Sequence, residues 1–179
     1  MRRVIATTAM AMIVAAGMSL EAQKTTQVHP GKGGSPHVKT EWTIDGANIS
    51  ITYGRPSLKG RDESTLMPPG KEWRTGADEA TTLTTDKSLM FGSLMVPAGT
   101  YTLYTVPGEK EWQLVISKKT GQWGIPYPQG EDLGRAPMKV SKNATPVEQL
   151  TISIDDTPEG GTLNIAWGTV KASIAFMVH

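Results

Sequence analysis

The fold class of this chain is indicated by residues 38–53, which read VKTEWTIDGANISITY. Apolar and polar residues alternate on both sides of the central Asp45-Gly46 pair, as they do in half-buried β-strands. An Asp-Gly pair between two alternating runs is typical of a type I′ turn, because that turn needs positive φ at both central residues. The stretch therefore predicts an antiparallel β-hairpin.

Similar short runs follow toward the C-terminus. They are separated by turn sequences such as VPAG at 96–99 and PGEK at 107–110, in which Pro presets φ and Gly accepts positive φ. Helical periodicity is almost absent. We therefore predict an all-β chain that forms a single-domain antiparallel β-sandwich or jelly roll over residues 38–179. The further strands are expected at 80–85, 89–95, 101–106, 111–117, 147–154, 162–167 and 170–178.

Two other features of this region bear on the fold. Residues 118–140 are rich in Gly and Pro and predict a long irregular loop, which in a compact domain is usually functional or packed against something. The alternating apolar positions of the strands predict the core. The expected core residues include Ile51, Val115, Ile152, Ile154, Leu163, Ile165, Ile174 and Phe176.

The N-terminus has the pattern of a secretory signal peptide. Arg2 and Arg3 precede the uncharged apolar run 4–20, and small residues lead to a cleavage site after Ala22, with Ser19 as the alternative. An uncleaved membrane anchor is the other interpretation of the apolar run. We predict a signal peptide over 1–22, an exported protein, periplasmic or extracellular, and no stable membrane insertion after cleavage. Residues 23–37 carry almost no large apolar side chain and predict a flexible leader.

Charge and cysteine content exclude several classes of function. Removal of residues 1–22 leaves 16 basic and 16 acidic residues, because Arg2, Arg3 and Glu21 are lost. A chain without basic excess is a poor candidate for nucleic-acid or anionic-membrane binding. It contains no cysteine, so thiolate zinc sites and cysteine nucleophiles are impossible.

The three histidines give little sign of a site. His29 and His37 lie in or beside the predicted leader, and His179 is the last residue. None of them has helical i, i+4 spacing or an acidic neighbour in a metal-ligand pattern. We therefore predict no metal and no cofactor. A serine–histidine triad would depend on His37.

The candidate site is a block of cationic, aromatic and acidic residues in two glycine-containing segments, 53–61 and 73–80, the first of which also contains Pro56. Arginine presents a planar fork that suits carboxylate, phosphate or sugar, and neighbouring aromatic rings offer stacking faces. The alternative is a surface loop held by ion pairs of little energetic weight. The predicted ligand-binding residues are Tyr53, Arg55, Arg61, Trp73, Arg74, Asp78 and Glu79. Trp123, in the long loop, is a further candidate for stacking.

The same motifs carry a family resemblance. They are YGRP at 53–56, KGR at 59–61, WRTGADEAT at 73–81, VPAGTY at 96–101 and TGQWG at 120–124. In this order they resemble a bacterial exported family catalogued as domain of unknown function 2911, over about residues 35–178. The resemblance implies secretion and a β-rich fold. It implies no particular activity.

Three functions remain open at this stage. The leading hypothesis is a non-catalytic domain that binds a small polar or anionic ligand, such as a saccharide or peptide. The second is a hydrolase or isomerase that uses Glu79 as acid or base and Arg55 or Arg74 to stabilise charge. The third is a structural envelope protein without a ligand. The first two predict that Arg55, Arg74 and Glu79 converge.

Overall fold

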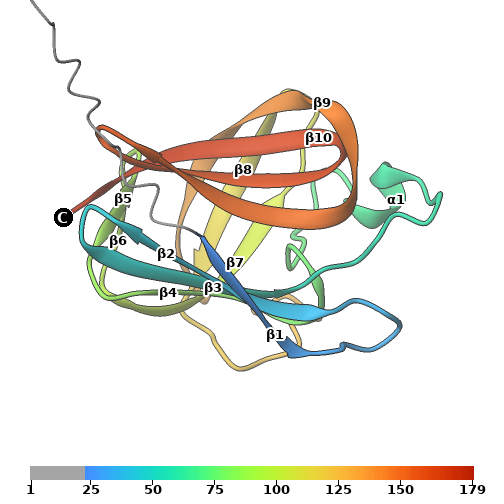
Figure 1. The fold of residues 1–179 in the computed structure, drawn as a ribbon, viewed down its shortest axis with the longest axis horizontal. Coiled ribbons are helices and arrows are strands. Elements are labelled where there is room, and N and C mark those ends of the chain that lie inside the picture. The colour runs from blue at the N-terminus through green and yellow to red at the C-terminus, as the bar shows by residue number, and fades with distance from the viewer. Residues whose placement is uncertain (1–22) are drawn as a thin grey trace, which may run out of the picture.

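Residues 23–179 form an antiparallel β-structure, as the sequence predicts, together with one short helix (Figure 1). A computed structural model describes residues 23–179, so the predicted signal peptide, 1–22, lies outside the described residues. The strands are β1 (Lys24–His29), β2 (His37–Ile44), β3 (Ala47–Gly54), β4 (Ala77–Thr85), β5 (Leu89–Phe91), β6 (Leu94–Val96), β7 (Gly99–Val106), β8 (Glu111–Ser117), β9 (Asp132–Thr157) and β10 (Gly160–Val178). The helix is α1 (Glu63–Leu66). Within the described residues, no helix is long and apolar enough to span a membrane.

The ten strands are hydrogen-bonded in one continuous sheet, in the order β1-β2-β3-β4-β7-β8-β9-β10-β5-β6. Figure 1 shows that this sheet curls over, so that β9 and β10 lie above β2, β3 and β4, and β7 and β8 join the two layers. The prediction of an all-β fold is confirmed. The β-sandwich or jelly roll is not confirmed, because the 26-residue β9 and the 19-residue β10 continue the hydrogen bonding around the fold and the strands form a single sheet.

The predicted hairpin is present. Ile44 pairs with Ala47, and the two turn residues have positive φ, 48° at Asp45 and 71° at Gly46. The hairpin succeeds as a prediction because its turn chemistry and its alternation are both local in sequence.

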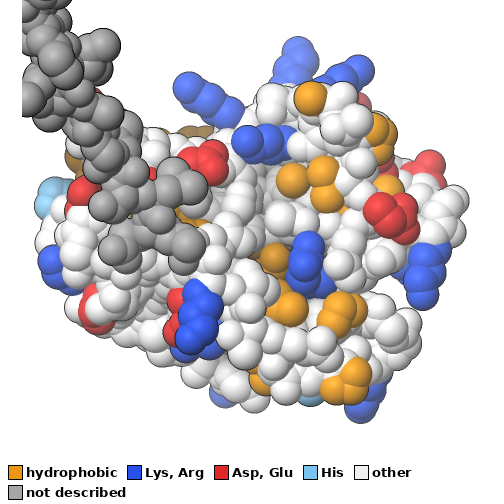
Figure 2. Space-filling view, in the orientation of Figure 1, with side chains coloured by type: hydrophobic (Ala, Val, Ile, Leu, Met, Phe, Trp, Pro, Cys, Tyr) orange, Lys and Arg blue, Asp and Glu red, His pale blue; other side chains and the backbone are white. Residues whose placement is uncertain are grey.

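The core lies between the layers of the curled sheet, and all of the residues expected there are buried. Val115 is buried apart from the main cluster. Tyr104, also buried outside that cluster, donates a hydrogen bond from its hydroxyl to the carbonyl of Gly124, and its ring meets that of Tyr127 edge-on at 4.9 Å. The loop 118–131 therefore covers the sheet over Tyr104. In Figure 2 the hydrophobic side chains visible on one face form small groups separated by polar and charged surface.

Four predicted segments differ from the structure. Residues 132–140, expected in the irregular loop, form the start of β9. The segment 89–95 is a tight hairpin of β5 and β6, and 162–167 and 170–178 are one strand, β10. Within the predicted leader, Lys24–His29 forms β1, which pairs with β2. This edge strand was missed because its side chains are almost all exposed, so it lacks the apolar alternation of a half-buried strand.

Candidate functional site

Tyr53 and Arg55, at the end of β3, join the lower layer of the fold to β9. The Tyr53 hydroxyl is buried and accepts a hydrogen bond from the backbone N–H of Ile152 at 2.9 Å. Arg55 donates from Nε to the carbonyl of Leu150 and from Nη2 to the hydroxyl of Thr151, both at 2.9 Å. The polar groups of both side chains therefore hold the end of β3 to β9.

Gly54, between them, lies in a row of residues that crosses four strands. The row runs His29, His37, Gly54, Ala77 from β1 to β4. A Cβ at Gly54 would lie 2.2 Å from the carbonyl oxygen of Ala77 and 3.0 Å from Cε1 of His37. Glycine is therefore required at position 54, because the backbone of Ala77 leaves no room for a side chain there.

The segment that leads into β4 is held in an unusual backbone conformation. Thr75 and Asp78 both have positive φ, 54° and 60°. Such conformations cost about 1–3 kcal/mol each for residues other than glycine and cluster at functional sites. Thr75 is buried and its hydroxyl bonds the Trp73 carbonyl and the Thr105 hydroxyl, which holds it there. Asp78 is also buried, and its Oδ2 accepts a hydrogen bond from the backbone N–H of Lys32 at 2.7 Å.

Arg74 lies between this segment and the loop 118–131. Its guanidinium carbon is 5.3 Å from the centroid of the Trp123 ring, and its Nη1 donates to the Trp123 carbonyl at 3.0 Å. Lys32 approaches the same ring, with Nζ at 5.2 Å from the centroid. Burial lowers the pKa of Arg74, and the nearby Asp78 carboxylate raises it again in part. The guanidinium stays charged, since arginine does not lose its proton in proteins.

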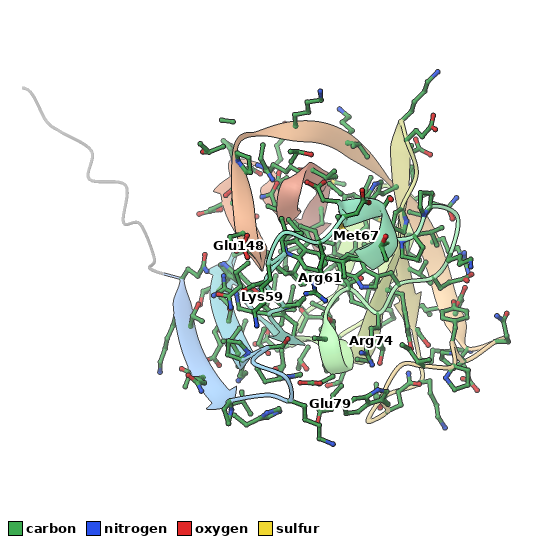
Figure 3. The ribbon with its side chains drawn as sticks, turned by 90° about the vertical axis from the view of Figure 1, so that its right-hand side faces the viewer. Lys59, Arg61, Met67, Arg74, Glu79 and Glu148 are labelled. Carbon is green, nitrogen blue, oxygen red and sulfur yellow. The ribbon has the colours of Figure 1, made fainter. Side chains whose placement is uncertain are left out.

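A cleft of about 530 Å³ opens beside Arg74. Its aromatic wall includes Trp73 and Trp167, whose rings stack at 5.8 Å. Figure 3 shows Arg61 and Arg74 on the face of the molecule that carries α1, with Glu79 at its lower edge. The charged residues that line the cleft are Lys32, Arg61, Glu72 and Arg74.

The charges in this cleft are unbalanced. Glu72 is paired with Arg135, whose Nη2 lies 3.1 Å from its carboxylate. Arg61 donates to two backbone carbonyls of its own loop, those of Leu58 and Ser57. Within residues 23–179, neither Lys32, Arg61 nor Arg74 has a carboxylate within 4.0 Å. The cleft therefore presents three cations whose charge is not neutralised by direct pairing.

Glu79 has partners that the sequence did not suggest. Its Oε2 lies 3.6 Å from Nε2 of His29 and 3.5 Å from Nε2 of His37. The two imidazole rings stack with their centroids 4.4 Å apart. Burial lowers the pKa of His37, against an opposing contribution from Glu79, so its ring is neutral near pH 7. This cluster was missed because the first two histidines were assigned to a leader. The β-branched residues Thr25, Thr26 and Val28 were a sign of the strand that positions His29.

The seven predicted site residues thus separate into three groups. Arg61, Trp73 and Arg74 line the cleft. Asp78 and Glu79 lie at the start of β4, where Asp78 accepts a hydrogen bond from the Lys32 backbone and Glu79 approaches the two histidines. Tyr53 and Arg55 face β9. The expected convergence of Arg55 with Glu79 is not found, because the guanidinium of Arg55 is bound to the Leu150 carbonyl and the Thr151 hydroxyl. The sequence analysis did not predict three further residues of this region, which are Lys32, His29 and His37.

The fold and the cleft define an all-β domain with a basic, tryptophan-walled recess. The chain belongs to the family described as Protein of unknown function (DUF2911), which it matches over residues 35–176. The matched region contains the whole cleft lining except Lys32 and Gly33, and it begins after His29. No significant match was found among curated proteins or among solved structures.

Proposed function

We propose that this protein is an exported binding domain that takes a small anionic ligand in the cleft beside Arg74. The observation that supports the proposal is the presence around one recess of three cations, Lys32, Arg61 and Arg74, that have no carboxylate partner among residues 23–179. Arg74 is half-buried, and a charged group that is partly removed from water is normally paired, whereas Lys32 and Arg61 are exposed and add positive charge at the rim. A ligand carboxylate or phosphate would supply the missing partner.

The residue types favour a carboxylate-bearing ligand with a face that can stack. Each guanidinium offers a planar fork that matches a carboxylate with two parallel hydrogen bonds. The indole of Trp123 is 41% exposed, and Lys32 and Arg74 approach it to 5.2 and 5.3 Å from the ring centroid, so it offers an apolar surface next to the charge. Acidic sugars and peptide C-termini share this chemistry, namely one carboxylate beside an apolar or ring face.

The contacts of Glu79 distinguish this proposal from the enzymatic alternative. That alternative needed Glu79 beside Arg55 or Arg74 so that the arginine could stabilise charge at a reacting group. No arginine lies within 4.0 Å of Glu79 in the described part of the chain, and its neighbours are two histidines. The cationic cleft therefore supports binding better than it supports this form of catalysis.

Calorimetric titration with matched ligand pairs tests the proposal. Galacturonate is compared with galactose, and a free-acid tripeptide with the same peptide amidated at its C-terminus. We expect binding of at least one acid and at least tenfold weaker binding of its neutral counterpart, because a charge-assisted hydrogen bond contributes about 1.5–3 kcal/mol. The acid that binds identifies the ligand class.

Charge-removing variants complete the test. Arg74→Gln and Arg61→Gln should weaken the binding of that acid about tenfold or more. Lys110→Gln, at the exposed β7–β8 turn and outside the cleft, is the control and should bind as the wild type does. Equal affinity for the acid and the neutral member of each pair, or no binding of either acid, would overturn the proposal and favour a structural envelope protein.

A further inference from the structure

The histidine–glutamate cluster next to the cleft is built like a metal site. His29 ends β1, His37 begins β2, and Glu79 reaches both from β4 across Gly54, which has no side chain to block the approach. The donor atoms of the three side chains all lie within 4.8 Å of one another. We propose that His29, His37 and Glu79 bind a divalent transition-metal ion.

The distances favour an ion between these groups over direct contacts. Hydrogen bonds from N–H to oxygen span about 2.7–3.2 Å, whereas Oε2 of Glu79 is 3.5 and 3.6 Å from the two imidazole Nε2 atoms. Ligands that bind a tetrahedral Zn²⁺ at about 2.0–2.1 Å lie about 3.4 Å from one another. The spacing is therefore too long for hydrogen bonds and close to that of two ligands on one ion.

His37 has the surroundings of a metal ligand. Its side chain is only 4% exposed, and its Nδ1 is buried without a hydrogen-bond partner in the described residues. A buried ring of this kind is costly to charge, so the fold favours the neutral imidazole that metals require. Coordination through Nε2 would give the ring a strong bond on the side that faces Glu79 and would leave the ring proton on Nδ1, where the described residues supply no acceptor.

His29 and Glu79 form the accessible side of the cluster. Their side chains are 40% and 51% exposed, so an ion can reach the site from solvent. In the structure Nδ1 of His29 accepts a hydrogen bond from the N–H of Gly31 at 3.1 Å, which places the proton of the neutral ring on Nε2. Coordination at Nε2 needs that proton on Nδ1, so the Gly31 hydrogen bond opens when the ion binds. The loop allows this, because Gly31, Gly33 and Gly34 give it an adaptable backbone.

The donor set indicates the class of ion. Two imidazoles and one carboxylate suit Zn²⁺, Co²⁺, Ni²⁺ or Fe²⁺ better than Ca²⁺ or Mg²⁺, which prefer all-oxygen sites. Three protein ligands also leave at least one coordination position for water or another ligand. This inference does not depend on the anion-binding cleft, because none of its three residues lines that cleft.

Titration of the purified, untagged protein with CoCl₂ and then ZnCl₂ tests the site. We expect one equivalent of Co²⁺ to bind with the visible absorption of a low-coordinate complex and to be displaced by one equivalent of Zn²⁺. His29→Gln and Glu79→Gln should each weaken Co²⁺ binding at least about tenfold, since changes merely beside a metal site already cost 10- to 100-fold. His37 is left unchanged because its side chain is buried, so a substitution there could prevent folding and would not isolate the effect on metal binding.

His179 provides the matched control, because it is the third histidine of the chain and is exposed at the C-terminus. His179→Ala should bind Co²⁺ as the wild type does. Nuclear magnetic resonance gives a second measurement, in which Zn²⁺ should shift the Gly31 amide and the His29 and His37 ring signals. Absence of one-to-one binding, affinity unchanged in both His29→Gln and Glu79→Gln, or shifts confined to His179 would overturn the proposal.

Discussion

The guanidinium of Arg74 lies over the indole of Trp123, 5.3 Å from the ring centroid, and donates a hydrogen bond to the Trp123 carbonyl at 3.0 Å. Gly124 makes this approach possible, because a Cβ there would lie 2.9 Å from Cβ of Ala80 and 3.1 Å from Cβ of Arg74. Two segments almost fifty residues apart in sequence are joined in this way. The loop 118–131 and the start of β4 therefore act as one wall beside the cleft.

Trp123→Ala is expected to weaken ligand binding more than it weakens the fold. The indole is 41% exposed, so its removal should lower the melting temperature by no more than a few degrees. Loss of the ring that Lys32 and Arg74 both approach should reduce affinity for the acidic ligand several-fold, because the two cations would no longer be held in place beside the cleft. Calorimetry and thermal melting measure the two effects. Met95→Ala, which also truncates an exposed apolar side chain, is the control.

Arg55 and Arg74 should respond in opposite ways to the same substitution. Arg55→Gln removes the hydrogen bonds to Leu150 and Thr151 that hold β3 to β9, so we expect a loss of about 1.5–3 kcal/mol in the free energy of unfolding. Arg74→Gln removes one hydrogen bond to the Trp123 carbonyl, so it should cost less than Arg55→Gln in the free energy of unfolding, and it should reduce ligand affinity. Urea unfolding of both variants measures the difference. Arg55→Gln unfolding like the wild type would contradict the structural role.

Tyr53→Phe should destabilise the protein although it removes a single oxygen atom. The buried N–H of Ile152 would lose its acceptor, at a cost of about 1–3 kcal/mol. Tyr101→Phe is the matched control, because the Tyr101 hydroxyl has no hydrogen-bond partner among residues 23–179. The free energies of unfolding in urea should rank Tyr53→Phe well below Tyr101→Phe, and equal values would contradict this account.

The core assignment predicts large effects at the end of the chain. Ile165→Ala should cost about 2–5 kcal/mol and Phe176→Ala about 3–5 kcal/mol, because each leaves a cavity in a packed interior. Met177→Ala, next to Phe176 but 47% exposed, should change stability by less than about 0.5 kcal/mol. Equilibrium unfolding of the three variants tests whether β10 alternates inward and outward as described.

Export is a separate prediction from residues 1–22. We expect the protein isolated from cells to begin near Gln23 and to be found outside the cytoplasm. Mass spectrometry of the intact protein from fractionated cells measures both. A chain in the cytosol that retains Met1 to Ala22 would contradict the prediction.

The sequence predicts this fold well where the decisive interactions are local. The Asp45-Gly46 turn and the alternation around it indicate a hairpin directly. A similar alternation of apolar and polar residues near the C-terminus identifies Ile165 and Phe176 as core residues. It fails where contacts are distant. An exposed edge strand carries no alternation, so nothing local shows that His29 pairs with His37 or that both meet Glu79.

The candidate site shows the same limit. Residue types drew attention to Arg61, Trp73 and Arg74, which line the cleft, because cationic and aromatic residues in glycine-containing segments make a poor core strand. Arg55 lies in the same segment as Arg61 and has the same chemistry. The Arg55 side chain faces β9 because Arg55 follows the last residue of β3, at the point where the chain meets Leu150. This orientation depends on a contact with a residue ninety-five positions away in the sequence.

The cleft is tested most directly by the side-chain Nε–Hε resonances of the arginines, followed by nuclear magnetic resonance during titration with the acid that binds in calorimetry. The neutral counterpart of that acid serves as the control ligand. Our account predicts saturable shifts of Arg61 and Arg74 with the acid, much smaller shifts of Arg55, whose Nε–H is held by the Leu150 carbonyl, and none with the neutral compound. Unmoved Arg61 and Arg74 signals at saturating acid, or the same shifts with the neutral compound, would contradict it.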